Sequence, residues 1–320
     1  MCFATDECRS KGGTSSGNCA AGFGVCCIFT ISSCGSSSSN NITYITNPGF
    51  PSTYTTAGTC TYTINKCQND ICQLRLDFVT LVQGVSTNPQ GCCGSSCTTV
   101  SDSLTVRGET GVNPPLICGT NTGEHMYIET GNLGTDSVSL ALFVSGTSSN
   151  QWNIRVSQIP CTATYRAPNH CVKYFTGTTG TVTSYGFAGS TLLGSQNYKS
   201  CIRQETGYCS IVWDQTTLNS PADAFDLTNA PAAGTAENRI GSCINSYVQI
   251  PSGILGPATG NPIQEFCGEN LGVQASTDPS TITSSTLPFD LATFTTASAM
   301  QDFAGGVSNG YSLSYRQQPC

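Results

Sequence analysis

The sequence predicts an all-β protein in which a small disulfide-rich N-terminal module precedes two tandem antiparallel β-sandwiches. Three observations lead to this fold class: short runs in which apolar and polar residues alternate, turn segments rich in glycine and proline between these runs, and one series of strands and cysteines that occurs twice. No segment shows helical periodicity. The function must therefore be one that a pair of disulfide-linked sandwiches can perform.

Individual strands are predicted by alternation. Leu74, Leu76 and Phe78 alternate with polar residues, as expected for a strand with one buried face and one solvated face. The same pattern continues along the chain, and turn residues separate the strands. The further strands lie within residues 60–64, 138–142, 152–156 and 311–315, and the turns lie at residues 47–49, 86–89, 111–115 and 251–253.

The two halves of the chain carry the same series of features. The series consists of two cysteines, a strand that starts at a third cysteine, a Cys-Gly step and a closing Gln-x-Pro-Cys. In the first half these features are Cys34, Cys60, 72–78, 118–119 and 158–161. In the second half they are Cys171, Cys201, 209–215, 267–268 and 317–320. This recurrence predicts a duplicated β module, with domains at residues 34–161 and 162–320 behind a cysteine-rich module at residues 1–33.

Cysteine content indicates an oxidising compartment. The chain has 20 cysteines in 320 residues and only two histidines, and no CxxC pairs recur at zinc-finger spacing. Disulfides formed outside the cytoplasm are the expected state of so many cysteines, so the protein is predicted to be secreted and extracellular. Met1 is not followed by a signal sequence, and we expect one to have been removed from this numbering.

Charge excludes two classes of partner. Only 10% of residues are charged and the formal net charge is -7, so the chain lacks the basic surface that binds phosphates in nucleic acids or anionic membranes. No apolar stretch approaches the roughly 20 residues that cross a bilayer as a helix. The expected partners are extracellular proteins or glycans, or further copies of the chain.

The first half resembles the CUB domain, an extracellular jelly-roll sandwich. The residues that carry the resemblance are, in order, Cys34-Gly35, Asn47-Pro-Gly-Phe-Pro51, Tyr54, Cys60-Thr-Tyr-Thr-Ile64, Asp102 and Cys118-Gly119. The second half lacks the Asn-Pro-x-x-Pro motif but keeps a similar cysteine frame. With the segments 71–78 and 123–127, the whole chain resembles the secreted CUB proteins common in arthropods. The resemblance implies two CUB-like jelly rolls and a binding role.

The resemblance also implies a set of disulfides. The pairs implied are Cys34–Cys60, Cys67–Cys72, Cys171–Cys201 and Cys243–Cys267. Separately, residues 1–33 hold five cysteines and residues 34–161 hold nine. Two odd counts predict one bridge between these modules, with Cys34 or Cys161 as the acceptor, unless thiols stay free or link different chains.

Many CUB domains bind calcium through a Glu and two Asp residues, because a hard divalent ion needs several oxygen ligands. Here Asp102 is retained as a weak candidate ligand, whereas Gln83 stands where the Glu is expected and Ser145-Gly146 stands near the later Asp. In the second half Ser246 and Ser298-Ala299 occupy the corresponding places. We therefore expect no calcium site and no other cofactor.

No arrangement of residues predicts catalysis. Gly13-Thr-Ser-Ser-Gly17 matches the Gly-x-Ser-x-Gly pattern, but a nucleophile elbow needs a strand, a sharp turn and a helix. His125 and His170 lie in no acid–base motif, and the pair Cys92-Cys93 with Cys97 is typical of loop disulfides. The protein is therefore predicted not to be an enzyme.

The remaining features concern the surface and the core. Asn41-Ile-Thr43 is an N-glycosylation sequon directly after a serine run, which favours an exposed glycan. Trp213 corresponds to Leu76 in the duplicated series and should be buried, with Asp77 and Asp214 on the opposite face. The resemblance implies a secreted interaction or structural protein that binds proteins or glycans, one form of which is a self-assembling extracellular matrix or fibre subunit. The alternatives are a soluble recognition protein, such as a pattern receptor or the binding component of an extracellular hydrolase complex, and a calcium-dependent adhesin.

Overall fold

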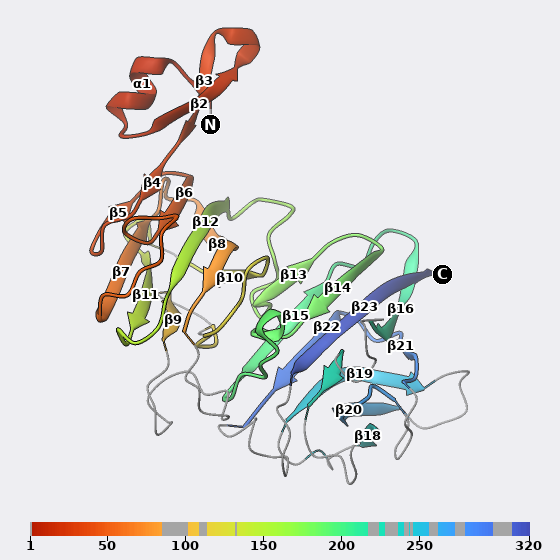
Figure 1. Cartoon of the computed structure of the whole chain (residues 1–320). Coiled ribbons are helices and arrows are strands. Elements are labelled where there is room, and N and C mark those ends of the chain that lie inside the picture. The colour runs from red at the N-terminus through yellow and green to blue at the C-terminus, as the bar shows by residue number, and fades with distance from the viewer. Residues whose placement is uncertain are drawn as a thin grey trace. The chain divides into compact units, whose positions relative to one another are not determined.

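The structure is a computed structural model that divides into two compact units. It describes residues 2–84, 102–108, 114–131, 133–216, 224–227, 236–239, 243, 246–255, 262–272, 279–296 and 309–320. Unit 1 comprises Met1–Gly84, Leu104–Pro114 and Thr122–Asn169, and unit 2 comprises Val85–Ser103, Pro115–Asn121 and His170–Cys320. Nearly all of the elements are strands, which confirms the all-β class (Figure 1).

The N-terminal module, predicted at residues 1–33, contains a three-stranded sheet, whereas Thr30–Ile31 near its end form a strand of the first sandwich. The elements of the module are β1 (Cys2–Phe3), helix α1 (Thr5–Ser10), β2 (Thr14–Cys19), the 3-10 helix η1 (Ala20–Gly22) and β3 (Gly24–Ile28), with strand order β1-β3-β2. Disulfides Cys2–Cys19 and Cys8–Cys27 hold it together, and Phe29 packs on the second of these in a minimal core. Helix α1 was not expected, because six residues are too few to show an apolar period.

The predicted disulfide between this module and the first sandwich is wrong. Cys34 pairs with Cys60, Cys161 pairs with Cys72, and Cys26 is a free and exposed thiol. The odd count of the module is explained instead by the alternative of a free thiol, because Cys26 pairs with no other cysteine among the described residues. A backbone hydrogen bond joins the module to the sandwich instead, because Tyr44 N donates to Phe29 O at 2.8 Å.

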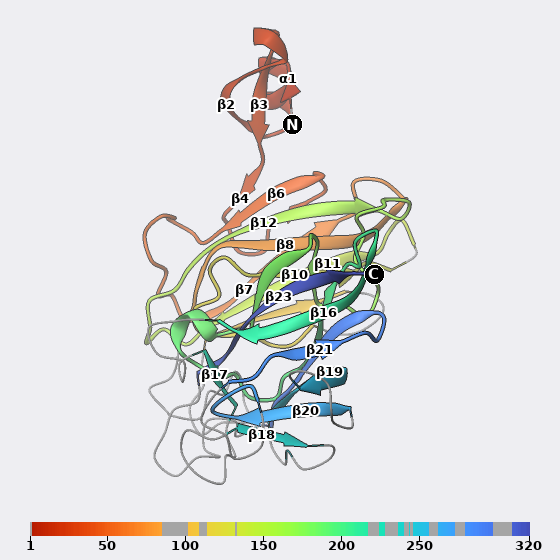
Figure 2. The same cartoon turned by 90° about the vertical axis from the view of Figure 1, so that its right-hand side faces the viewer.

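The first sandwich consists of two sheets. The five-stranded sheet has the order β10-β8-β12-β6-β4, and the four-stranded sheet has the order β5-β7-β11-β9. Figure 2 shows β12 extended between β6 and β8. The strands are β4 (Thr30–Ile31), β5 (Ser37–Ser38), β6 (Ile42–Thr46), β7 (Gly58–Asn65), β8 (Ile71–Val82), β9 (Ser103–Arg107), β10 (His125–Glu129), β11 (Ser137–Val144) and β12 (Gln151–Pro160).

The core of this sandwich follows the predicted alternation. Leu74, Leu76 and Phe78 are at most 1% exposed, and Leu76 lies opposite Val156 of β12. Tyr62 of the other sheet is fully buried, and its hydroxyl donates to Thr46 O at 3.0 Å. Burial raises the pKa of Tyr62 from 10.0 to about 12, because the phenolate would lose its hydration.

Three of the four disulfides implied by the resemblance are present, namely Cys34–Cys60, Cys171–Cys201 and Cys243–Cys267. The fourth, Cys67–Cys72, is replaced by Cys72–Cys161. The reason lies in the sheet: Cys72 is the second residue of β8 and Cys161 directly follows β12, and these strands are antiparallel neighbours. Cys67 is left as a thiol in the β7–β8 connection.

Unit 2 contains a larger strand network. Its main path is β13-β15-β22-β19-β21-β16-β23-β14, and β17, β18 and β20 pair off this path. The elements are β13 (Lys173–Phe175), β14 (Thr179–Thr183), the 3-10 helix η2 (Phe187–Gly189), β15 (Asn197–Ile202), β16 (Tyr208–Gln215), β17 (Phe225–Asp226), β18 (Ala236–Arg239), β19 (Tyr247–Leu255), β20 (Ile263–Gly268), β21 (Ile282–Ser284), β22 (Phe289–Phe294) and β23 (Gly310–Pro319).

Trp213 of β16 is fully buried in the core of unit 2, as predicted. Its ring lies 5.8 Å from that of Tyr315, which is its register partner on β23. Asp214 points to the other face, where its Oδ2 accepts from Arg316 Nη1 at 2.7 Å. The duplicated series therefore gave the correct register for this strand.

Some sequence-based expectations lie outside the described residues. These are the turn at 86–89, part of the turn at 111–115, the cluster Cys92, Cys93 and Cys97, and Ser298-Ala299. Among the described residues there is no helix with the length and apolarity that spanning a bilayer requires.

Candidate binding site

The solvated face of the five-stranded sheet in unit 1 carries one continuous row of polar side chains. His125 pairs with Asp77, Asp77 with Arg155, Arg155 with Tyr44, and Tyr44 with Thr30. Residues that are directly paired across strands lie on the same face of a sheet. The row therefore crosses all five strands, from β10 to β4.

The centre of the row is a charged cluster around Asp77. Arg75 Nε donates to Asp77 Oδ1 at 2.7 Å, and Arg155 Nη1 donates to Oδ2 at 3.2 Å. Arg75 Nη1 also donates to the Tyr127 hydroxyl at 2.9 Å. Burial raises the pKa of Tyr127, and the nearby Arg75 only partly opposes this. Because Asp77 already accepts from two guanidinium groups, this cluster positions side chains rather than supplying a free base.

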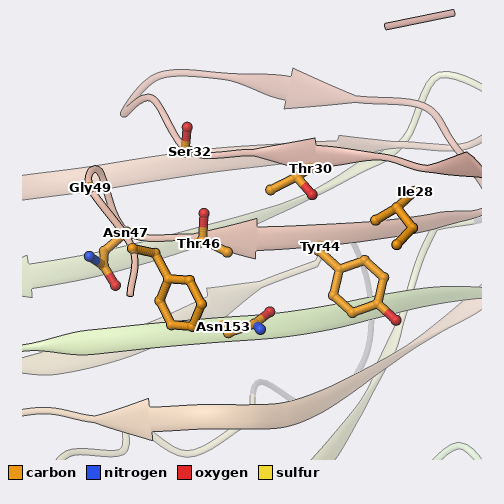
Figure 3. A pocket seen from close by; sticks show the side chains of 9 residues that line it. Ile28, Thr30, Ser32, Tyr44, Thr46, Asn47, Gly49 and Asn153 are labelled. Carbon is orange, nitrogen blue, oxygen red and sulfur yellow. The ribbon is translucent and has the colours of Figure 1, made fainter. Parts of the chain in front are cut away.

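Next to the cluster, the sheet face is hollowed into an open cavity of about 570 Å³. That volume is within the range of roughly 300–1,000 Å³ that is common for small-molecule sites. Its floor comes from β4, β6 and β12, and one wall comes from the loop after β6 (Figure 3). The lining residues are Ile28, Thr30, Ser32, Tyr44, Thr46, Asn47, Gly49, Phe50 and Asn153, none of which is charged.

The wall of the cavity is fixed by Asn47. Its Nδ2 donates to Pro48 O at 3.0 Å and to Ser52 O at 2.8 Å, and its Oδ1 accepts from Trp152 N at 3.0 Å. Asn47 is fully buried, so these bonds are shielded from water. The loop at 47–52 is therefore held to β12 in one conformation.

A second cavity of about 140 Å³ lies on the other side of Tyr44. It is lined by residues of the N-terminal module and of the sheet, namely Cys26, Cys27, Ile28, Phe29, Ile42, Tyr44 and Arg155. Tyr44 and Ile28 line both cavities. The two hollows therefore adjoin each other at Tyr44 and Ile28.

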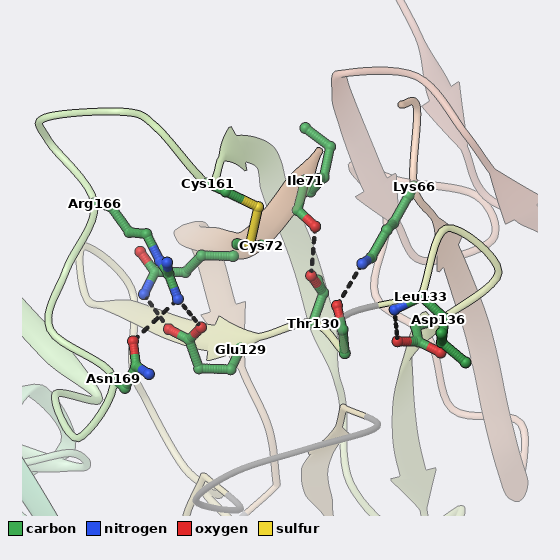
Figure 4. The surroundings of a disulfide bond; sticks show 12 residues. Lys66, Ile71, Cys72, Glu129, Thr130, Leu133, Asp136, Cys161, Arg166 and Asn169 are labelled. Atoms are coloured by element: carbon green, nitrogen blue, oxygen red, sulfur yellow. Dashed lines mark hydrogen bonds and ion pairs between the residues drawn. A yellow bond between two sulfur atoms is a disulfide. The ribbon is translucent and has the colours of Figure 1, made fainter. Parts of the chain in front are cut away.

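Beyond β12, residues 161–169 are attached to the same sheet. Arg166 Nη2 donates to Glu129 Oε2 at 2.6 Å and to Asn169 Oδ1 at 3.0 Å, close to the Cys72–Cys161 disulfide (Figure 4). The segment that follows the first sandwich is therefore ordered against β8 and β10.

The candidate metal and glycan residues lie in unlike environments. Asp102 is fully buried, and Gln83 is 2% exposed with no hydrogen-bond partner for its amide among the described residues. Ser246 is also buried, whereas Ser145 bonds Thr147 in a loop, at 2.9 Å between their hydroxyl oxygens. Asn41 is half-exposed just before β6, which leaves room for a glycan at this position.

One group of potential metal ligands occurs among the described residues, in unit 2. His170, Cys171, Cys201 and Asp290 lie with their ligand atoms within 4.8 Å of one another. The two sulfurs are joined in a disulfide, and Lys199 Nζ lies 3.1 Å from Asp290 Oδ2. A disulfide is a poor metal ligand and the ammonium group repels cations, so this group does not fit a metal ion.

The residues considered for catalysis lie in different elements. Thr14 to Gly17 lie in the exposed strand β2, which Gly13 directly precedes, and form no elbow. His125 packs edge-on against Tyr127 at 5.7 Å, and His170 Nε2 lies 3.5 Å from Asp290.

Sequence reasoning missed the cavity. The cavity depends on the parallel pairing of β4 with β6 and on the hydrogen bonds of Asn47, and the periodicity of the sequence reveals neither. The available signal was the position of Tyr44 and Asn153 on the polar face of their strands.

Comparison with known families identifies part of the chain. Residues 168–318 match the animal CUB domain, so the second half, in which the motif resemblance is weaker, is the part that the family model covers. No curated protein matches the chain in sequence.

Solved structures give weak overall likenesses. The CUB1-EGF-CUB2 domain of human MASP-1/3 is 16% identical over 87% of this chain and 100% of its own, with a TM-score of 0.29. The CUB1-EGF-CUB2 domains of rat MASP-1 are 16% identical over 90% and 99%, with a TM-score of 0.29. The full extracellular region of zebrafish Gpr126/Adgrg6 is 13% identical over 90% and 34%, with a TM-score of 0.32. Scores this low carry no argument about function.

Proposed function

We propose that the protein is a secreted, non-enzymatic interaction protein that binds extracellular proteins or glycans. Two features support this: the CUB domain at residues 168–318, a kind of domain that generally mediates protein interactions, and the disulfides that pin both units. The observation that carries the proposal is the uncharged cavity on the sheet of unit 1, because a rigid concave surface with aromatic and hydroxyl groups suits binding.

Residues 34–161 are proposed to be a second CUB-like domain, of the kind found in secreted arthropod proteins. The residues of its motif have clear structural roles. Asn47 fixes the proline-containing loop, and Tyr54 packs edge-on against Trp152 with ring centroids 5.5 Å apart. Cys34–Cys60 then joins the start of the domain to β7.

Calcium is proposed to be unnecessary for stability. In the first sandwich Gln83 stands in place of an acidic ligand, and an amide binds a hard cation less strongly than a carboxylate does. The melting temperature should not change when EDTA is added. A drop of several degrees that calcium restores would contradict this.

Asn41 is proposed to carry an N-linked glycan. When the chain is expressed in secretory cells, peptide N-glycosidase should increase its mobility on a gel. Asn41→Gln should remove this shift without reducing the amount secreted. An enzyme-sensitive shift that persists in the variant would contradict the assignment.

A second candidate function is a self-assembling extracellular subunit. It is favoured by the thiols of Cys26 and Cys67, the free cysteines among the described residues, of which Cys26 is exposed. Static light scattering of native material separates the alternatives: a polymer supports the structural role and a monomer supports a soluble recognition role.

The binding function can be tested with insoluble extracellular material. Labelled full-length chain should bind it saturably, and unlabelled chain should compete. Asn153→Trp, which fills the cavity, should lower the bound fraction, whereas Tyr165→Ala, which removes an exposed tyrosine outside the cavity, should not. Absence of saturable binding would contradict the proposed function.

A further inference from the structure

We propose that the cavity of about 570 Å³ on unit 1 is a binding site for a short neutral oligosaccharide. The inference rests on the proposed binding function and specifies the ligand that this site takes.

The polar groups on the floor match sugar hydroxyls. Thr30, Ser32 and Thr46 provide hydroxyl groups, and Asn153 provides an amide. A hydroxyl group both donates and accepts hydrogen bonds. These side chains therefore complement neighbouring sugar hydroxyls whether those donate or accept. The register brings them together, since Thr30 pairs with Tyr44 on one side of β6 and Thr46 pairs with Asn153 on the other.

Asn153 has unused hydrogen-bonding capacity in this site. Its Oδ1 is buried and has no hydrogen-bond partner among the described residues. Figure 3 shows its side chain facing the same hollow as Tyr44 and Thr46. A buried oxygen without a hydrogen-bond partner is unfavourable, and a turn of the amide that brings this oxygen to a hydroxyl of a bound sugar would relieve it.

Two aromatic rings complete the chemistry. Tyr44 and Phe50 are half-buried and line the cavity together with Ile28. The C–H faces of a sugar ring pack against flat aromatic surfaces, which offer apolar contact at a low cost in conformational entropy. Hydroxyl groups on the floor and rings at the sides suit a ligand that is polar at its edges and apolar on its faces.

The site is built before a ligand arrives. The segment 28–32 lies between the disulfides Cys8–Cys27 and Cys34–Cys60, and Asn47 pins the opposite wall. Gly49 at the turn has φ +77°, a conformation that residues with a Cβ rarely adopt. A preformed site loses little entropy when it binds its ligand.

Charge and position argue against other ligands. No lining residue is charged, so an anionic or cationic ligand would find no counter-charge within the cavity. The two guanidinium groups around Asp77, of Arg75 and Arg155, are not among its lining residues. A peptide that adds a strand would pair with the backbone edge of β4, whereas this cavity is lined by side chains on the face of the sheet.

The test is calorimetric titration of the full-length chain with the hexasaccharides of cellulose, chitin, laminarin and amylose, and with a heparin hexasaccharide. At least one neutral probe should bind more tightly than heparin. Tyr44→Ala and Asn153→Ala should each weaken it about tenfold, as expected for the loss of a central contact. Tyr44→Phe should keep most of the affinity and Tyr165→Ala all of it, and circular dichroism checks that each variant folds.

Failure to bind any neutral probe, or equal affinity in Tyr44→Ala and Asn153→Ala, would overturn this inference. Saturable binding of the same preparation to extracellular material separates the two proposals. If that binding persists while the sugars fail, the interaction function stands and the carbohydrate site does not.

Discussion

The side chain of Gln73 pairs with both backbone polar groups of Ala167. Nε2 of Gln73 donates to Ala167 O at 3.0 Å, and its Oε1 accepts from Ala167 N at 2.9 Å. Gln73 is 1% exposed, so the two bonds form in a nearly dry environment, where they fix the segment 161–169 on β8. The first sandwich thus includes a stretch of chain that follows its last strand.

Replacing Gln73 with Leu should release this segment. The change leaves the N–H and C=O of Ala167 unsatisfied, at a cost of about 1–3 kcal/mol for each group that remains buried. Hydrogen exchange should show faster exchange of the Ala167 amide, and Gln68→Ala, at an exposed glutamine, serves as the control. Unchanged protection at Ala167 in Gln73→Leu would contradict the role of the pair.

The two free thiols should differ in reactivity. Burial raises the pKa of Cys67, so its thiolate fraction near pH 8 is reduced, whereas Cys26 is exposed. Pulsed alkylation of monomeric, unreduced protein should label Cys26 faster than Cys67, and peptide mapping should recover Cys72 linked to Cys161. A Cys67–Cys72 peptide would show that the observed pairing is wrong.

Trp213→Ala should destabilise unit 2 by about 3–5 kcal/mol, because it removes a large buried ring and leaves a cavity. Trp213→Phe should cost less, since Nε1 has no hydrogen-bond partner among the described residues and the aromatic contact with Tyr315 is largely kept. Urea unfolding followed by circular dichroism measures both variants. Equal costs would indicate that the indole group makes an essential polar contact.

Stability should fall at alkaline pH because of Tyr62. Its pKa is about 12 in the folded chain and 10.0 ordinarily, so the folded state holds the proton more tightly. The stabilisation is complete below pH 10 and is lost as the pH rises toward 12. Tyr62→Phe should flatten this part of the stability profile, and an unchanged profile would contradict the burial of the hydroxyl group.

The sequence was informative where one local pattern decides the structure. Alternation placed Leu76 and Phe78 in the core, and the duplicated series placed Trp213 in a second core. The sequence did not reveal the disulfide partner of Cys72, because Cys161 is 89 residues away and becomes close only when β8 and β12 pair. The cavity was missed for a similar reason, because contacts between distant segments build it.

The most direct test of the binding role is hydroxyl-radical footprinting of the full-length chain, first purified and then bound to extracellular material. Tyr44 and Phe50 line the cavity, and the exposed Tyr165 lies outside it and serves as the internal reference. We expect the bound chain to show lower oxidation of Tyr44 and Phe50 with unchanged oxidation of Tyr165. Equal oxidation of Tyr44 and Phe50 in the two states would contradict the claim that this surface binds the ligand.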